Sequence, residues 1–120
     1  MPHGFSQVIA THGGKTIYVS GQSAWDTEKR LVGGNNLVEQ AKQAFQNVRH
    51  AVEAAGGSLA DVVALRLYVV NYRPTDANSL GRVLWEFFPG AHPPTSTWIG
   101  VSSLAVSNFL IEIEAVAVVE

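Results

Sequence analysis

The sequence has no cysteine and little charge, and both absences exclude classes of function. Without cysteine there is no disulfide, no thiolate nucleophile and no zinc site built on cysteine. Asp, Glu, Lys and Arg make up 15% of the 120 residues, against roughly 25% in ordinary globular domains. The eight basic residues are scattered along the chain, and the net charge is −2. Because no basic stripe exists to neutralise phosphates, we expect no nucleic-acid partner.

Long apolar runs are missing as well. None approaches the roughly 18 residues that span a membrane, and residues 1–4 do not resemble a signal peptide. We therefore expect a cytoplasmic protein with no membrane partner. The chain is 47% hydrophobic, which predicts a single domain over residues 1–120 with a sizeable core. A chain this apolar and this poorly charged is also expected to bury surface against copies of itself.

No pattern of metal ligands or nucleophiles stands out. The histidines lack i, i+4 spacing and no acidic residue completes a ligand set, so we interpret them as solvated side chains. The serines lack the Gly-x-Ser-x-Gly pattern of a nucleophile elbow, and the glycines form neither a Walker loop nor a dinucleotide-binding motif. The histidines concerned are His3, His12, His50 and His92.

Periodicity predicts the order of the elements. Alternation favours five strands, and apolar steps of three and four favour two helices. The first two strands are expected to form a hairpin across Gly13-Gly14, and Gly21 is expected to mark a bulge. The order ββαβαββ is typical of an α+β fold with two helices on one face of a mixed sheet. The strands are expected over 5–10, 16–20, 62–70, 96–101 and 109–119, and the helices over 37–55 and 75–88.

Two glutamates in the last strand are the most informative residues. Glu112 and Glu114 stand two apart, so both share one face of the strand while Ile111 and Ile113 share the other. Carboxylates in so apolar a strand are costly unless they are paired, hydrogen-bonded or wet. They form either an acid/base or water-activating site, or a pair of structural acceptors bonded to backbone amides or to Arg66.

Arg66 lies in the middle of the predicted strand 62–70. Alternation places Val63, Leu65, Leu67 and Val69 on one face of that strand, and Arg66 with Tyr68 on the other. A buried guanidinium needs a partner. Arg66 is therefore either the partner of the two glutamates or an anchor for the anionic group of a ligand.

Several motifs, in this order and spacing, resemble the RidA family, also called YjgF or endoribonuclease L-PSP. The resemblance covers residues 3–119. Its most specific parts are the Ser-Gly-Gln motif after the second strand and the Ile-Glu-Ile-Glu-Ala motif near the C-terminus. The matching segments are Phe5-Ser6-Gln7, Val19-Ser20-Gly21-Gln22, Gln40 with Asn47-Val48, Glu53-Ala54-Ala55-Gly56-Gly57, Asp61-Val62-Val63 and Ile111–Ala117.

The resemblance implies a chorismate-mutase-like fold assembled as a homotrimer, with a small-molecule site in each cleft between subunits. Members of the active type hydrolyse reactive enamines and imines to keto acids and ammonia, and they use no metal or cofactor. The resemblance implies that Glu112 positions water and that the Ser20-Gly21 backbone lines the cleft. It also implies that Phe5 stands where the active type usually has tyrosine.

The sequence departs from the active type at one decisive position. The family motif Pro-Ala-Arg-Ser corresponds here to Pro93-Pro94-Thr95-Ser96, so Thr95 replaces the arginine that grips the substrate carboxylate. A threonine offers one hydroxyl and no charge, whereas a guanidinium offers a charge-assisted fork. Arg66 is a candidate for a relocated anchor.

The sequence thus predicts a RidA-like small-molecule protein, with two functions left open. One is a cofactor-free hydrolase or deaminase of an imine, enamine or related metabolite. The alternative is a non-catalytic trimer that binds a metabolite or modulates a partner. Ribonuclease activity is not expected, because the basic stripe is missing. The residues assigned to the site are Glu112 as the catalytic group and Phe5, Ser20, Gly21, Arg66, Thr95 and Ser96 as ligand contacts.

Overall fold

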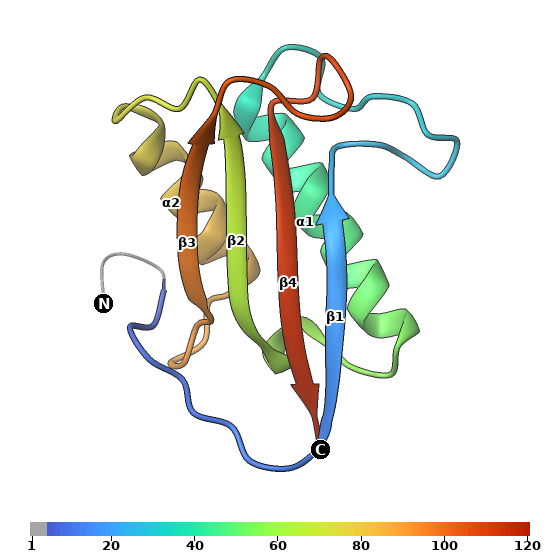
Figure 1. Ribbon diagram of the computed structural model, residues 1–120, viewed down its shortest axis with the longest axis vertical. Coiled ribbons are helices and arrows are strands. Elements are labelled where there is room, and N and C mark those ends of the chain that lie inside the picture. Colours follow the sequence, from blue (N-terminus) through green and yellow to red (C-terminus); the bar gives the residue numbers. More distant parts are fainter. Residues whose placement is uncertain (1–4) are drawn as a thin grey trace.

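The computed structural model describes residues 5–120, which form one four-stranded sheet and two helices. The order across the sheet is β1-β4-β2-β3, seen from right to left in Figure 1. Strand β4 is antiparallel to both of its neighbours, whereas β2 and β3 are parallel. The predicted α+β class and mixed sheet are therefore confirmed. The elements are β1 (Lys15–Gln22), α1 (Leu37–Ala54), a 3-10 helix (Leu59–Asp61), β2 (Val62–Val70), α2 (Asp76–Phe87), β3 (Thr95–Val101) and β4 (Ile111–Val119).

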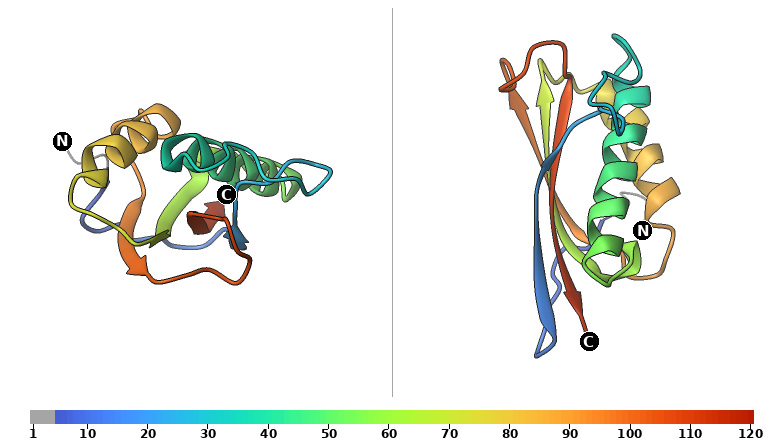
Figure 2. Two further views of the ribbon diagram at one scale, coloured as in Figure 1. Left: turned by 90° about the horizontal axis from the view of Figure 1, so that it is seen from above. Right: turned by 90° about the vertical axis from the view of Figure 1, so that its right-hand side faces the viewer.

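Both helices lie on the same face of the sheet (Figure 2). Helix α1 is capped by Asn36, whose side chain accepts a hydrogen bond from the backbone N–H of Glu39 at 3.0 Å. The apolar stripes of the helices pack on alternate residues of the central strands, and this layer is the core. Within residues 5–120, neither helix is long and apolar enough to cross a membrane. The largest core side chains are Phe45, Leu67, Leu80, Leu84, Ile111 and Ile113.

No helix formed by residues 5–120 covers the other face of the sheet (Figure 2). Strand register places Tyr18, Val116, Ala64 and Thr95 in one row across this open face. The Tyr18 side chain is 80% exposed. An aromatic and aliphatic row of this kind is unusual on a surface that faces only water.

The predicted first strand does not form, so the order is βαβαββ rather than ββαβαββ. Residues 5–14 instead run past the lower ends of the strands in Figure 1, from the β3 edge of the sheet to its β1 edge. Ser6 makes a single parallel bridge to Thr95, and Val8 is 82% exposed. The expected hairpin is wrong because the partner of β1 is β4, and β1 stands at the edge of the sheet.

Two bulges change which side chains face the core. In β2, the register with β4 shifts between Val62 and Ala64, so Val62 is buried and Val63 is only half-buried. The predicted alternation holds beyond the bulge, where Leu65 faces the core with the residues that follow it at every second position. In β1, the register shifts between Val19 and Gln22, which confirms the bulge expected at Gly21.

The buried side chain of Gln40 ties two loops to α1. Its Nε2 donates to the carbonyls of Gly34 at 2.7 Å and Asn108 at 3.0 Å, while its Oε1 accepts from the N–H of Leu110 at 2.8 Å. Gln40 has no exposed surface, and every polar atom of its amide has a partner. This amide therefore fixes the chain just before β4, the strand that carries the two glutamates.

Candidate small-molecule site

The carboxylate of Glu112 lies over Gly21, at the bulge of β1. A Cβ atom built on Gly21 would stand 2.6 Å from Cδ and 2.7 Å from Cγ of Glu112, and closer still to Oε2. Real Cβ contacts are essentially never shorter than 3.0 Å. The absence of a side chain at Gly21 is therefore what lets this carboxylate occupy its position.

The hydroxyl of Ser23 completes the seat of the carboxylate. Its Oγ donates to Oε1 of Glu112 across 3.4 Å, a long hydrogen bond, and the Ser23 side chain is almost wholly buried. Glu112 itself is half-buried, so part of the carboxylate faces solvent or a ligand. An acceptor that is seated on one side and open on the other can orient a water molecule or a ligand N–H.

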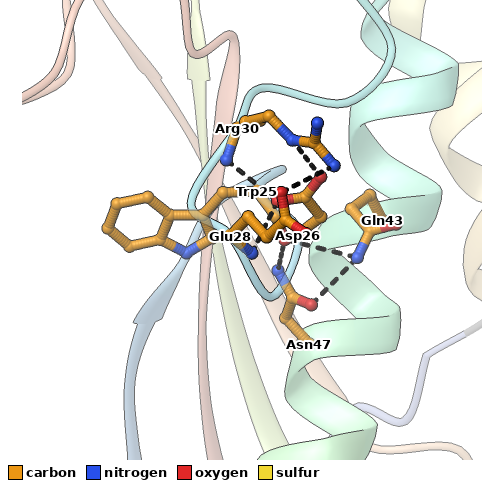
Figure 3. A network of polar contacts seen from close by, with 6 residues as sticks. All are labelled: Trp25, Asp26, Glu28, Arg30, Gln43 and Asn47. Atoms are coloured by element: carbon orange, nitrogen blue, oxygen red, sulfur yellow. Dashed lines mark hydrogen bonds and ion pairs between the residues drawn. The ribbon is translucent and has the colours of Figure 1, made fainter.

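The turn that follows Ser23 is anchored to α1 by amide side chains (Figure 3). Asn47 Nδ2 donates to the carbonyls of both Ser23 and Trp25, each at 2.8 Å. Gln43 donates to the Trp25 carbonyl at 3.4 Å and to the Asn47 side chain at 3.0 Å. Helix α1 thus holds the turn that positions Ser23 against Glu112, which is a structural reason for an asparagine at position 47.

The far side of this turn is closed by Asp26 (Figure 3). Its Oδ1 accepts from the backbone N–H groups of Glu28 at 2.9 Å and Arg30 at 3.0 Å, and its Oδ2 pairs with the Arg30 guanidinium at 3.1 Å. The backbone N–H of Arg30 is the main cause that lowers the pKa of Asp26 below its ordinary value of 3.8. The turn is therefore a defined structure, held by hydrogen bonds and an ion pair.

Trp25 lies two residues after Ser23, in the same turn, and was not among the predicted site residues. Its indole meets the ring of Phe109 edge-on at 5.6 Å, and Phe109 is three residues before Glu112. The Lys29 ammonium lies 5.6 Å from the centre of the indole. Loops have no periodicity that assigns side chains to a face, so the signal in the sequence was an aromatic residue soon after the Ser-Gly-Gln motif.

The remaining predicted contacts gather at the start of β3. The N–H of Ser6 donates to the carbonyl of Pro94 at 2.9 Å, and the Ser6 hydroxyl donates to the carbonyl of Pro93. These bonds hold the half-buried Phe5 next to the half-buried Thr95 and Ser96. The two prolines supply acceptors without donors, which suits an edge where a second segment docks.

The hydroxyls of Thr95 and Ser96 differ in the hydrogen bonds that they can still make to a ligand. Thr95 donates its hydroxyl proton to the carbonyl of Val63 at 3.0 Å, so only its oxygen lone pairs remain for a ligand. Ser96 accepts from the indole N–H of Trp98 at 2.7 Å, so its proton remains available. Neither side chain supplies a charge.

The middle of the open face holds a second carboxylate, that of Glu114. Tyr68 donates its hydroxyl to Glu114, and this bond is the main cause that raises the pKa of Tyr68 above its ordinary value. Arg66 lies directly opposite Glu114 in the register, yet within residues 5–120 it forms no ion pair. The partner of Glu114 is therefore Tyr68, and the expected pairing of Arg66 with a glutamate is not observed.

The predicted site residues form two separate groups in one chain. Ser20, Gly21 and Glu112 lie at the β1–β4 end, whereas Phe5, Thr95 and Ser96 lie at the opposite end beside β3. Thr95 pairs with Ala64 and Glu112 pairs with Tyr68, four residues further along β2. Strand geometry then puts Thr95 and Glu112 about 16 Å apart.

Arg66 stands between these groups. It is a diagonal neighbour of Thr95 across the β2–β3 pair and of Glu112 across the β2–β4 pair, on the same open face. Diagonal neighbours of this kind are about 7–8 Å apart, within reach of a long side chain. Its guanidinium is the cation placed centrally on this face.

The described residues offer no metal site. Among residues 5–120, no group of three or more His, Cys, Asp or Glu side chains could hold a metal ion. His12, His50 and His92 are all exposed, as expected of solvated histidines, and His3 lies outside the described residues.

Comparison with known proteins decides the family. The family model described as Endoribonuclease L-PSP matches residues 2–119. The chain belongs to the Endoribonuclease L-PSP family. This confirms the resemblance to RidA and YjgF proteins inferred from the Ser-Gly-Gln and Ile-Glu-Ile-Glu-Ala motifs.

Relatives within the family differ in what their names assign to them. A protein of Dermatophagoides farinae named 2-iminobutanoate/2-iminopropanoate deaminase is 33% identical over 116 residues, covering 97% of this chain and 86% of the relative. A RutC family protein of Pyrococcus abyssi is 34% identical over 113 residues, covering 94% of this chain and 84% of that protein.

Solved structures of the family share the fold. A Rid family protein of Yersinia pestis, YyfB, described as of unknown function, has a TM-score of 0.95 at 40% identity and covers 98% of this chain and 89% of its own. The YjgF gene product of E. coli has a TM-score of 0.76 at 28% identity, covering 91% of this chain and 84% of its own. The similarity to YyfB is thus markedly stronger than the similarity to YjgF.

Proposed function

We propose that the protein hydrolyses a small imine or enamine in a cleft built between copies of the chain, without a metal or cofactor. The observation that carries the proposal is the seat of Glu112, whose carboxylate is held between Gly21 and Ser23 with one side open. The similarity to a relative named as a 2-iminobutanoate/2-iminopropanoate deaminase supports the same chemistry.

Glu112 acts on water in this reaction. It accepts a proton from a water molecule as the water oxygen bonds to the imine carbon. The imine nitrogen takes up that proton, which gives an intermediate with a hydroxyl and an amino group on one carbon. The hydroxyl proton then passes to the nitrogen as the carbon–nitrogen bond breaks, so that ammonia leaves and the carbon becomes the carbonyl of a 2-oxo acid. The backbone at Ser20-Gly21 and the hydroxyls of Thr95 and Ser96 orient the ligand.

The complete site needs more than one copy of the chain. The Glu112 group and the Thr95 group lie at opposite ends of one sheet, so they meet only when the β3 edge of one copy approaches the β1–β4 end of another. The open face supports such an assembly, because the exposed Tyr18 lies in one row with the half-buried apolar side chains of Val116 and Ala64. We propose a homotrimer, in keeping with the family resemblance.

Arg66 is proposed as the anchor for the ligand carboxylate. Thr95 is uncharged and has already donated its proton, whereas Arg66 has no ion-pair partner among the described residues and is a diagonal neighbour of both groups. Removing a hydrogen-bonded charge partner costs about 10- to 100-fold in affinity. Arg66→Ala is therefore expected to raise KM for a 2-imino acid by about that factor.

The same lack of charge at Thr95 favours a second candidate function. If the natural ligand has no carboxylate, the cleft binds a neutral metabolite through the Thr95 lone pairs and the Ser96 proton, with no turnover. This second function is a metabolite-binding or partner-modulating trimer.

Ammonia release from enzymatically generated 2-imino acids separates these functions. We would compare wild type with Glu112→Gln, Arg66→Ala and Thr95→Arg in one coupled assay, with each variant checked for folding. Activity in wild type that is lost in Glu112→Gln supports the hydrolase. Activity in Thr95→Arg alone shows that the natural ligand lacks the carboxylate, and inactivity of all folded variants supports the binding protein. Sedimentation measures whether the assembly has three times the chain mass of 12.9 kDa.

A further inference from the structure

We propose that Trp25 is the apolar wall of the Glu112 half of the cleft and selects ligands with an apolar side chain larger than a methyl group. The inference deepens the proposed function and rests on it for the assay substrates. Trp25 would contact the side chain of the ligand, whereas Glu112 would act on the water and the imine carbon.

Trp25 is connected to Glu112 indirectly, through Ser23 and through Phe109. Along the chain it stands two residues after Ser23, whose hydroxyl contacts the Glu112 carboxylate. Through space its indole packs edge-on against Phe109, in the segment that leads into β4 three residues before Glu112. A ligand group that extends from the carboxylate toward this turn therefore meets the indole.

The backbone of Trp25 is fixed from several directions. Its N–H donates to the carbonyl of Ser23 at 3.0 Å, and its carbonyl accepts from Asn47 and Gln43 of α1 (Figure 3). An isolated antiparallel bridge joins it to Leu31. A wall that is already ordered loses little entropy when a ligand binds against it.

The indole does not belong to the main hydrophobic core. The buried cluster between the helices and the sheet, and the half-buried apolar side chains packed on it, do not include Trp25 or Phe109. Trp25 is half-buried, with Phe109 at its edge and the Lys29 ammonium over the ring. A large aromatic ring outside the core, held by the same ordered turn whose Ser23 contacts the Glu112 carboxylate, is the arrangement of a ligand-binding surface.

The test compares two 2-imino acids that differ only in the side chain. They are 2-iminopropanoate, with a methyl group, and 2-imino-4-methylpentanoate, generated by an amino-acid oxidase from alanine and leucine. Each added methylene in an apolar pocket is worth about tenfold in kcat/KM. We expect wild type to prefer the larger substrate by at least that factor, and Trp25→Ala to bring the ratio of the two kcat/KM values close to one.

Two further variants separate recognition from folding. Trp25→Phe keeps an aromatic wall of smaller area, so its ratio should lie between those of wild type and Trp25→Ala. Trp85→Ala removes an indole that is 49% exposed on α2, and it should keep the wild-type ratio. A wild-type ratio of one, or the same ratio in wild type, Trp25→Phe and Trp25→Ala, would overturn the inference and leave the hydrolase intact.

A second measurement covers the failure of the proposed function. If wild type releases ammonia from neither substrate, binding of pyruvate and 4-methyl-2-oxopentanoate is measured by calorimetry in the same variants. A preference for the larger acid that is lost in Trp25→Ala supports the role of Trp25 in ligand binding, although the protein is then not an imine hydrolase. Three results would contradict both the role of Trp25 and the hydrolase function. They are equal binding of the two acids by wild type, a preference that is kept in Trp25→Ala, and no binding of either acid.

Discussion

Gly21→Ala is expected to separate the activity of the protein from its stability. The new Cβ would stand 2.6 Å from Cδ of Glu112, and an ordinary contact begins at 3.4 Å. The atoms in its way belong to the far end of one flexible side chain, so the carboxylate can yield while the backbone stays. The Glu112 carboxylate would therefore move by about 1 Å or more, which is the scale of misplacement that costs about 100-fold in rate.

The free energy of unfolding should change little. Gly21 is not among the residues with positive φ, so alanine fits its backbone conformation without strain. Replacing glycine in a compatible extended position gains about 0.4–1 kcal/mol by restricting the unfolded chain. That gain offsets the weak bond from Ser23 to Glu112 that the shift would break, since a single hydrogen bond contributes about 0.5–1.5 kcal/mol. The net change in unfolding free energy should stay below about 1 kcal/mol.

The assay pairs ammonia release from 2-iminopropanoate with urea unfolding of the same preparation. Gly21→Ala should lose about 100-fold in kcat/KM, close to the loss in Glu112→Gln, while its unfolding midpoint stays near that of wild type. Gly90→Ala is the matched control, because its Cβ would meet no atom within 4 Å. Wild-type turnover in a folded Gly21→Ala protein would refute the catalytic role of Glu112. A loss of several kcal/mol in stability would refute the argument that only the Glu112 side chain has to move.

Three further predictions concern stability and pH. Gln40→Leu keeps the volume of a fully buried side chain but strands the carbonyls and N–H that the amide serves, so urea unfolding should show a loss of about 2–4 kcal/mol. The pKa of Asp26 is lowered in the folded state, so its contribution to stability is present above pH 3.8 and lost as the pH falls below it. Melting curves between pH 5 and 3, a range of about two units around that value, should therefore fall more gently in Asp26→Asn than in wild type. Gly81→Ala in α2 has open space for its Cβ and should raise the unfolding free energy by about 1 kcal/mol, and a decrease would contradict the packing around α2.

The sequence was sufficient for elements whose burial repeats with a fixed period. Helix α1 and strand β4 were predicted within two residues of their ends, because one apolar face of each packs on the core. The alternation that placed Glu112 and Glu114 on one face and Ile111 and Ile113 on the other is confirmed by their burial. Core packing reinforces the local preference in these elements, so pattern and structure agree.

Pairing partners could not be predicted, since local pattern does not say which strand lies next to which. Residues 5–10 have a strand-like composition, yet only Ser6 pairs, and it does so with β3 rather than with β1. The same limit explains Arg66, whose cross-strand neighbour Glu114 is bonded to Tyr68 instead. Trp25 was missed because an ordered turn depends on side chains of a distant helix, here Asn47.

The proposed homotrimer explains both the low charge of the chain and the separation of its site residues into two groups. A monomer would expose the apolar row of Tyr18 and Val116 and would leave Glu112 far from Thr95. Burying the open face against other copies removes the exposed apolar surface, which is a favourable change of about 25 cal/mol per Å². The contact that buries this face also brings the Glu112 end of one copy toward the Thr95 end of the next. Assembly and formation of the site are then one event, so the apolar residues of the open face contribute to function without contacting the ligand.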